Sequence, residues 1–146
     1  MEFERTYRLY DRETKSFCFR EFSSFIDLWR SKSTSNKFPS LGEYDFEDFG
    51  DWYGRLSLGE IINPEKMQMI LWGTQLTEWW GADYTKKEPE FLGEAYKNCW
   101  FESEIKYLQT MFETKSIGIW QGNLVQVNRS FKSIKSIDLP CPRMAR

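Results

Sequence analysis

The sequence predicts a single domain of the α+β class. The chain has 146 residues, a length at which one hydrophobic core can form. Aromatic residues make up 18% of the chain, far more than disordered proteins carry, so a packed interior is expected. Strand-like stretches lie before and after the longest stretch with helical spacing, so both helices and strands are expected.

The absence of histidine limits the chemistry that the chain can perform. Histidine is the commonest general base and a common metal and haem ligand, so mechanisms that pair it with serine or cysteine are excluded. The cysteines, Cys18, Cys99 and Cys141, are odd in number and widely spaced, which fits neither a disulfide framework nor a zinc site. Glu102 and Glu104 fall on different sides of a helix and form no carboxylate pair. We therefore expect a protein that is not an enzyme and has no metal site.

Charge and hydropathy indicate the surroundings of the chain. The formal net charge is −2, and the basic residues that follow Lys115 are expected on the solvent faces of strands, so no nucleic-acid partner is predicted. The first residues are charged and contain no apolar signal segment. No apolar stretch approaches the ~20 residues of a membrane span. A cytoplasmic protein with reduced thiols and no membrane contact is expected.

The chain is expected to divide into an N-terminal arm, residues 1–22, and a domain, residues 23–146. The arm contains the aromatic stretches "RTYRLY" and "SFCFREF" on either side of a polar segment, which is typical of either a hairpin or a poorly ordered arm. In the stretch "SSFIDLWR", Phe25, Leu28 and Trp29 have helical spacing and predict a short helix. A serine-rich connector and a second short helical stretch, "YDFEDFGDWYG", follow.

A hairpin and a tryptophan-rich helix are expected next. The stretches "RLSLGEII" and "MQMILW" are two antiparallel strands joined by a turn at "NPEK". Gly73 ends the second strand, Thr74 is the candidate N-cap of a short helix, and Gly81 ends that helix in the left-handed conformation. Trp79 and Trp80 are expected to pack inward.

The second half of the chain is expected to form the longest helix and two further strands. Phe101, Ile105, Leu108 and Phe112 repeat at helical spacing and indicate one buried face. The following residues are rich in β-branched side chains, and Pro140 closes this region, so two strands are predicted.

The elements and several short motifs resemble the PAS-like sensory domains found in single-domain proteins of proteobacteria. The resemblance spans roughly residues 25–141 of this chain. The residues that carry it are a helix with a tryptophan, a proline before a "DF" pair, a strand ending in Gly-Thr, a "G-x-D-hydrophobic-T" segment and a strand ending in Leu-Pro. In this sequence they are Trp29, Pro39, Asp45, Phe46, Gly73, Thr74, Gly81, Asp83, Thr85, Leu139 and Pro140.

The resemblance implies an antiparallel sheet with helices on one face and a cavity between the sheet and the long helix. Such domains sense small molecules or dimerise, so a non-catalytic sensing or signalling module with an apolar ligand is expected. The alternative is a ligand-free scaffold that binds a protein partner or a second copy in transcriptional or signal regulation. The candidate residues for the pocket are Met67, Met69, Leu71, Phe101, Ile105, Leu108 and Ile119.

No cofactor is predicted. The segment "KNCWF" resembles the cysteine motif of flavin-binding light sensors, but Trp100 replaces the arginine of that motif and Cys99 lies at the long helix itself. Haem is disfavoured because the chain has no histidine.

The PAS fold has one more strand, in the middle of its sheet beside the first strand, and nothing after Pro140 resembles it. Unpaired strand edges there would be costly. The interpretations are a fold-back of residues 5–22 into the gap, which we favour, a strand from a second copy, or a split sheet in a truncated chain.

Overall fold

The computed structural model describes residues 5–33, 43–63, 66–85, 90–91, 101–124 and 128–141, and its mixture of helices and antiparallel strands confirms the α+β class. The strands are β1 (Arg5–Tyr10), β2 (Ser57–Asn63), β3 (Lys66–Trp72), β4 (Glu90–Phe91), β5 (Ile117–Leu124) and β6 (Arg129–Asp138). The helices are η1 (Ser16–Phe22), α1 (Ser23–Lys32), α2 (Phe46–Phe49), η3 (Gly50–Arg55), α3 (Thr74–Trp80) and α5 (Phe101–Thr114), of which η1 and η3 are 3-10 helices.

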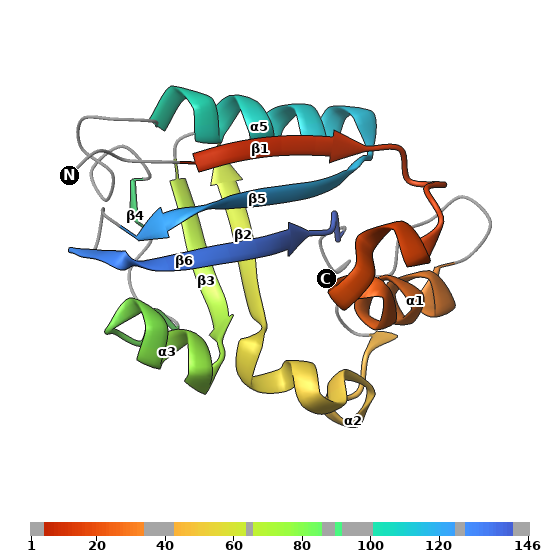
Figure 1. The fold of residues 1–146 in the computed structure, drawn as a ribbon, viewed down its shortest axis with the longest axis horizontal. Coiled ribbons are helices and arrows are strands. Elements are labelled where there is room, and N and C mark those ends of the chain that lie inside the picture. The colour runs from red at the N-terminus through yellow and green to blue at the C-terminus, as the bar shows by residue number, and fades with distance from the viewer. Residues whose placement is uncertain are drawn as a thin grey trace.

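The described strands form two three-stranded antiparallel sheets, in the orders β1-β5-β6 and β2-β3-β4. Figure 1 shows β2 and β3 running across the direction of β1, β5 and β6. The hairpin predicted from "RLSLGEII" and "MQMILW" is confirmed as β2 and β3. The expectation of one sheet with helices on one face is not met in the described part of the chain.

The reason lies in β5, which carries apolar side chains on both of its faces. Ile117 and Ile119 pack with η1 and α1 in one cluster of the core. Trp120 and Leu124 pack with Tyr107 of α5 in a second cluster. Since successive side chains of a strand point to opposite faces, the β1-β5-β6 sheet needs helices on both sides.

The N-terminal segment completes the β1-β5-β6 sheet, so its expected place in a gap beside β2 is wrong. β1 pairs along its whole length with β5, with Tyr7 opposite Trp120 and Tyr10 opposite Ile117. An aromatic pair on one face and a pair of an aromatic with a β-branched side chain on the other favour the addition of β1 to β5.

The stretch "SFCFREF" forms η1 and not the second strand of a hairpin. Phe19 and Phe22 of η1 are 5% and 9% exposed, and they contact Ile26 and Trp29 of α1 in the first core cluster. Residues 5–22 are therefore integrated into the core on which the rest of the domain is built.

The tryptophan-rich segment has the predicted strand, helix and glycine order. Gly73 itself occupies the N-cap position, because its carbonyl accepts the Thr77 backbone N–H at 3.0 Å, so the prediction of Thr74 as the cap is wrong. Gly81 ends α3 in the left-handed conformation with φ of 85°, as predicted. Trp79 and Trp80 are partly buried against the second core cluster.

The buried face of α5 differs from the predicted one. Tyr107 and Met111 are 5% and 2% exposed, whereas Phe112 is 43% exposed. Leu108 packs against the second core cluster. Compared with the predicted orientation, α5 is turned so that Tyr107 faces the sheet, where its hydroxyl donates a hydrogen bond to β6. The spacing of apolar residues does not reveal this contact.

Candidate functional site

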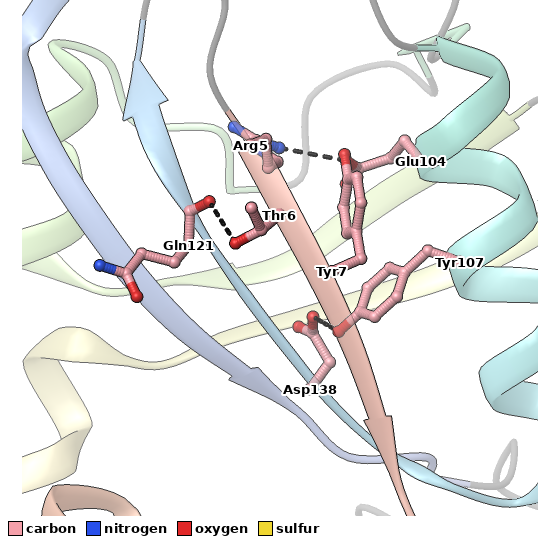
Figure 2. Close-up of polar contacts among 7 residues, drawn as sticks. All are labelled: Arg5, Thr6, Tyr7, Glu104, Tyr107, Gln121 and Asp138. Atoms are coloured by element: carbon pink, nitrogen blue, oxygen red, sulfur yellow. Dashed lines mark hydrogen bonds and ion pairs between the residues drawn. The ribbon is translucent and has the colours of Figure 1, made fainter.

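The two faces of the β1-β5-β6 sheet carry different groups of polar side chains. On the α5 side lies the polar cluster, which consists of Arg5, Tyr7, Glu104, Tyr107 and Asp138 (Figure 2). Glu104 Oε2 accepts hydrogen bonds from Arg5 Nη1 at 3.1 Å and from the Tyr7 hydroxyl at 2.5 Å. The Tyr107 hydroxyl donates to Asp138 Oδ2 at 2.6 Å. α5 is thus tied to β1 and to β6 by separate polar contacts.

Burial governs the protonation of the polar cluster. Desolvation, with a smaller contribution from Glu104, raises the pKa of Asp138 to about 6, although the Tyr107 hydrogen bond and Arg5 act in the opposite direction. Desolvation likewise raises the pKa values of Tyr7 and Tyr107 well above the usual range of a phenol, so both remain protonated donors. Glu104 and Asp138 each accept a partly buried hydrogen bond from a tyrosine hydroxyl, and these contacts hold α5 against the sheet.

The Arg5 guanidinium balances the acids. Its side chain is 3% exposed and lies 4.0 Å from the centroid of the Trp120 ring, in a cation–π contact. Tyr7 and Tyr107 pack with ring centroids 4.8 Å apart. A buried ion pair surrounded by rings leaves little freedom for α5, and breaking one partner of such a pair costs about 3–5 kcal/mol.

The opposite face of the same sheet carries a hollow of about 280 Å3, which we name the basic hollow. Its cations come from three elements: Arg8 from β1, Arg20 from η1 and Lys135 from β6. The remaining lining residues are Tyr10, Cys18, Phe19 and Ile119. Arg8 and Tyr10 lie opposite Ile119 and Ile117, which places them on the face away from α5.

The cations of the basic hollow differ in their partners. Lys135 Nζ forms an ion pair with Glu21 Oε1 at 3.0 Å, and a backbone hydrogen bond together with Lys135 holds the pKa of Glu21 below its usual range. The guanidinium groups of Arg8 and Arg20 make no hydrogen bond or ion pair with any residue that the structure describes. The hollow therefore has an excess of positive charge.

Arg20 holds a backbone conformation that favours glycine. Its φ and ψ angles are 50° and −110°, and Gly50 adopts nearly the same angles, 50° and −126°. This is the mirror image of a common turn conformation and is accessible mainly to residues without a Cβ atom. A non-glycine residue in such a region costs on the order of 1–3 kcal/mol, and strain of this kind is concentrated at functional sites.

The predicted pocket residues are distributed over β3, α5 and β5. Met69 and Leu71 lie half-buried on β3, and Ile105 and Leu108 lie half-buried on α5. Ile119 faces away from α5, packs with the first core cluster and lines the basic hollow. The side chains of Met67 and Phe101 lie outside the described set.

The residues that carry the PAS resemblance have structural roles where they are described. The Trp29 indole donates to the Pro140 carbonyl at 3.2 Å, which joins the first long helix to the end of β6. The Thr85 backbone N–H donates to Asp83 Oδ1 at 2.8 Å in a local turn. Thr74 is exposed at the start of α3. Pro39 lies outside the described residues.

Gly73 has a further role that the strand-to-helix turn alone does not require. A Cβ atom on Gly73 would lie 2.2 Å from the carbonyl oxygen of Gly54, so β3 and η3 approach each other closely at this glycine.

The cationic and tyrosine residues on the two faces of the β1-β5-β6 sheet were not predicted as site residues from the sequence. For the residues of β1 a signal was available in the alternation of "RTYRLY", because it places Arg5 and Tyr7 on one face and Arg8 and Tyr10 on the other.

Comparison of the chain with protein-family models, curated proteins and solved structures gives no match. Within the described ranges, no three acidic, cysteine or histidine side chains are grouped so that they could hold a metal ion. None of the described helices has the length and apolar character needed to cross a membrane.

Proposed function

We propose that this chain is a non-catalytic binding module that senses a small molecule at the basic hollow. The single observation that carries the proposal is the convergence of three elements, β1, η1 and β6, on one hollow with unneutralised positive charge. Concave sites with a few convergent polar groups are the usual form of small-molecule sites. The motifs that resemble PAS-like sensory domains favour the same class of function.

The β1-β5-β6 sheet connects the basic hollow to α5, so ligand binding in the hollow can change the contacts of α5. Arg8 follows Tyr7 in β1, so adjacent residues of one strand face the hollow and the polar cluster. β6 does the same with Lys135 and Asp138. A ligand that draws β1 and β6 together on one face changes the geometry of the carboxyl and phenol contacts on the other. We propose α5 as the element that reports binding.

Native mass spectrometry of the protein purified from cells, followed by hydrogen exchange, tests this function. We expect a small molecule that is released on denaturation. Refolded, ligand-free protein should exchange the amides of α5 faster than the loaded protein, because the polar cluster then holds the helix less tightly. A preparation with no retained molecule and no ligand-dependent change in α5, after a screen of metabolites, contradicts the proposal.

A second candidate function is a protein-interaction scaffold, and two exposed phenylalanines favour it. Phe17 of η1 is 71% exposed and Phe131 of β6 is 75% exposed. Exposed rings of this kind are typical anchors of protein interfaces. Replacing Phe131 by serine should abolish self-association or partner binding, as measured by light scattering and pull-down, while leaving small-molecule binding unchanged. Phe112→Ser is the matched control, since Phe112 is also exposed but lies on α5.

A further inference from the structure

We infer that the ligand of the basic hollow is a small molecule that carries a dianionic oxyanion, such as a phosphate monoester. This inference rests on the proposed function and names the chemical class of its ligand. Two features support it: the charge of the hollow and the strained conformation of Arg20. The size of the hollow limits the rest of the ligand.

The charge of the hollow suits a doubly negative group. Three cations line it, and the ion pair with Glu21 accounts for one of them, Lys135. Arg8 and Arg20 remain as two guanidinium groups that contact no acid among the described residues. Guanidinium forks match the oxygens of phosphate and carboxylate, and arginine is favoured wherever such groups are recognised.

The hollow is small, and polar atoms form most of its surface, because its apolar lining residues pack into the core. Phe19 is 5% exposed and contacts Tyr10 edge-on with ring centroids 5.2 Å apart, and Ile119 packs against the same core cluster. A volume of about 280 Å3 is near the lower end of small-molecule sites. The organic group that carries the anion is therefore no larger than a single ring or a short aliphatic chain.

The backbone conformation of Arg20 is independent support for a binding role of its guanidinium group. Glycine fits the angles of Arg20 without strain, as Gly50 shows in the same chain. Phe19 and Phe22 are buried on either side of Arg20 and hold this part of η1 in place. Strain that the surrounding core maintains at a cavity lining is typical of a preorganised binding residue.

Isothermal titration calorimetry at low ionic strength with phenyl phosphate, inorganic phosphate and benzyl alcohol tests the inference. We expect saturable one-to-one binding of phenyl phosphate and of inorganic phosphate, and no binding of neutral benzyl alcohol. Arg20→Gly and Arg8→Gln should each weaken phenyl phosphate binding by about tenfold or more, because each removes a charge-assisted contact. Arg12→Gln is the matched control, since Arg12 pairs with Glu13 and does not line the hollow.

The variants also separate binding from folding. Arg20→Gly relieves backbone strain, so its melting temperature should not fall, and a loss of affinity in it reports the lost guanidinium. Equal affinity in all variants means an adventitious ion only and overturns the inference, as does tight binding of the neutral probe. If phenyl phosphate fails to bind while the protein from cells retains a neutral molecule, the anionic class is wrong and the binding function stands. If neither is found, both fail.

Discussion

Gly118 and Tyr107 approach each other so closely that a Cβ atom on residue 118 would lie 2.1 Å from the Tyr107 hydroxyl oxygen and 2.7 Å from its Cζ. β5 can therefore pass beneath α5 only with glycine at this position. Gly118 also lies opposite Asp138 in the β5–β6 register, so the same contact brings the tyrosine to its carboxyl partner.

Gly118→Ala should lower the free energy of unfolding by about 2–4 kcal/mol, because it overpacks the interface and displaces the Tyr107 hydrogen bond. Chemical denaturation of a double-mutant cycle checks this. In the Tyr107→Ala background the ring is absent, and the further cost of Gly118→Ala should fall below about 1 kcal/mol. Equal costs in both backgrounds would mean that the clash is relieved elsewhere.

The raised pKa of Asp138, about 6 against an ordinary value of 3.8, predicts a pH-dependent stability. Between these values the folded protein retains a proton that the unfolded chain has released. The free energy of unfolding should therefore fall as the pH rises from about 4 to about 6, by at most about 3 kcal/mol, and the contribution of Asp138 should be constant above that range.

Variants of the polar cluster test whether Asp138 causes this pH dependence of stability. Asp138→Asn should remove the fall between pH 4 and 6, because an amide does not titrate and can still accept the Tyr107 hydrogen bond. Tyr107→Phe should move the fall to higher pH, since the hydrogen bond that favours the carboxylate is lost. Urea denaturation across the pH range measures both, and an unchanged profile in Asp138→Asn assigns the effect to another group.

Substitution of Gly50 measures the energetic cost of the backbone conformation that Gly50 shares with Arg20. A Cβ atom on Gly50 has nothing within 4 Å, so Gly50→Ala introduces backbone strain without a steric contact. We expect it to destabilise the protein by about 1–3 kcal/mol, measured by thermal denaturation. Arg20→Gly should change stability in the opposite direction. A neutral Gly50→Ala would show that the loop relaxes to another conformation at no cost.

Trp80 joins α3 to both sheets through edge-on contacts with Trp72 and Trp120, at centroid distances of 5.3 Å and 6.5 Å. Trp80→Ala should lower the free energy of unfolding by about 3 kcal/mol, the value expected for a large aromatic side chain that is partly buried. Trp80→Phe keeps a ring in place and should cost less than half as much. Denaturation followed by circular dichroism distinguishes the two variants.

Local patterns predicted much of this fold. The hairpin of β2 and β3, the left-handed end of α3 at Gly81 and the strands β5 and β6 follow from turn residues and from β-branched stretches that act over a few positions. The pairing of β1 with β5 could not be predicted in this way, because more than a hundred residues separate them and the choice of neighbour depends on packing between distant side chains.

The candidate sites depend on such distant contacts throughout. Helical spacing selected Phe112 for the buried face of α5, whereas the structure buries Tyr107, whose partner lies on β6. Arg20 gave no local signal at all, because a positive φ angle at arginine contradicts its intrinsic preference and is imposed by the buried phenylalanines around it.

The backbone conformation of Arg20 also has a consequence for sequence evolution at this position. Every arginine codon becomes a glycine codon by one base substitution, and at this position the substitution removes a strained residue from the backbone. Mutation and folding stability therefore both act to replace the arginine, and marginal stability makes such replacements easy to accept. If the hollow binds a ligand as proposed, we expect diverged copies of the gene to retain arginine at this position where binding is retained and to replace it by glycine where binding is lost.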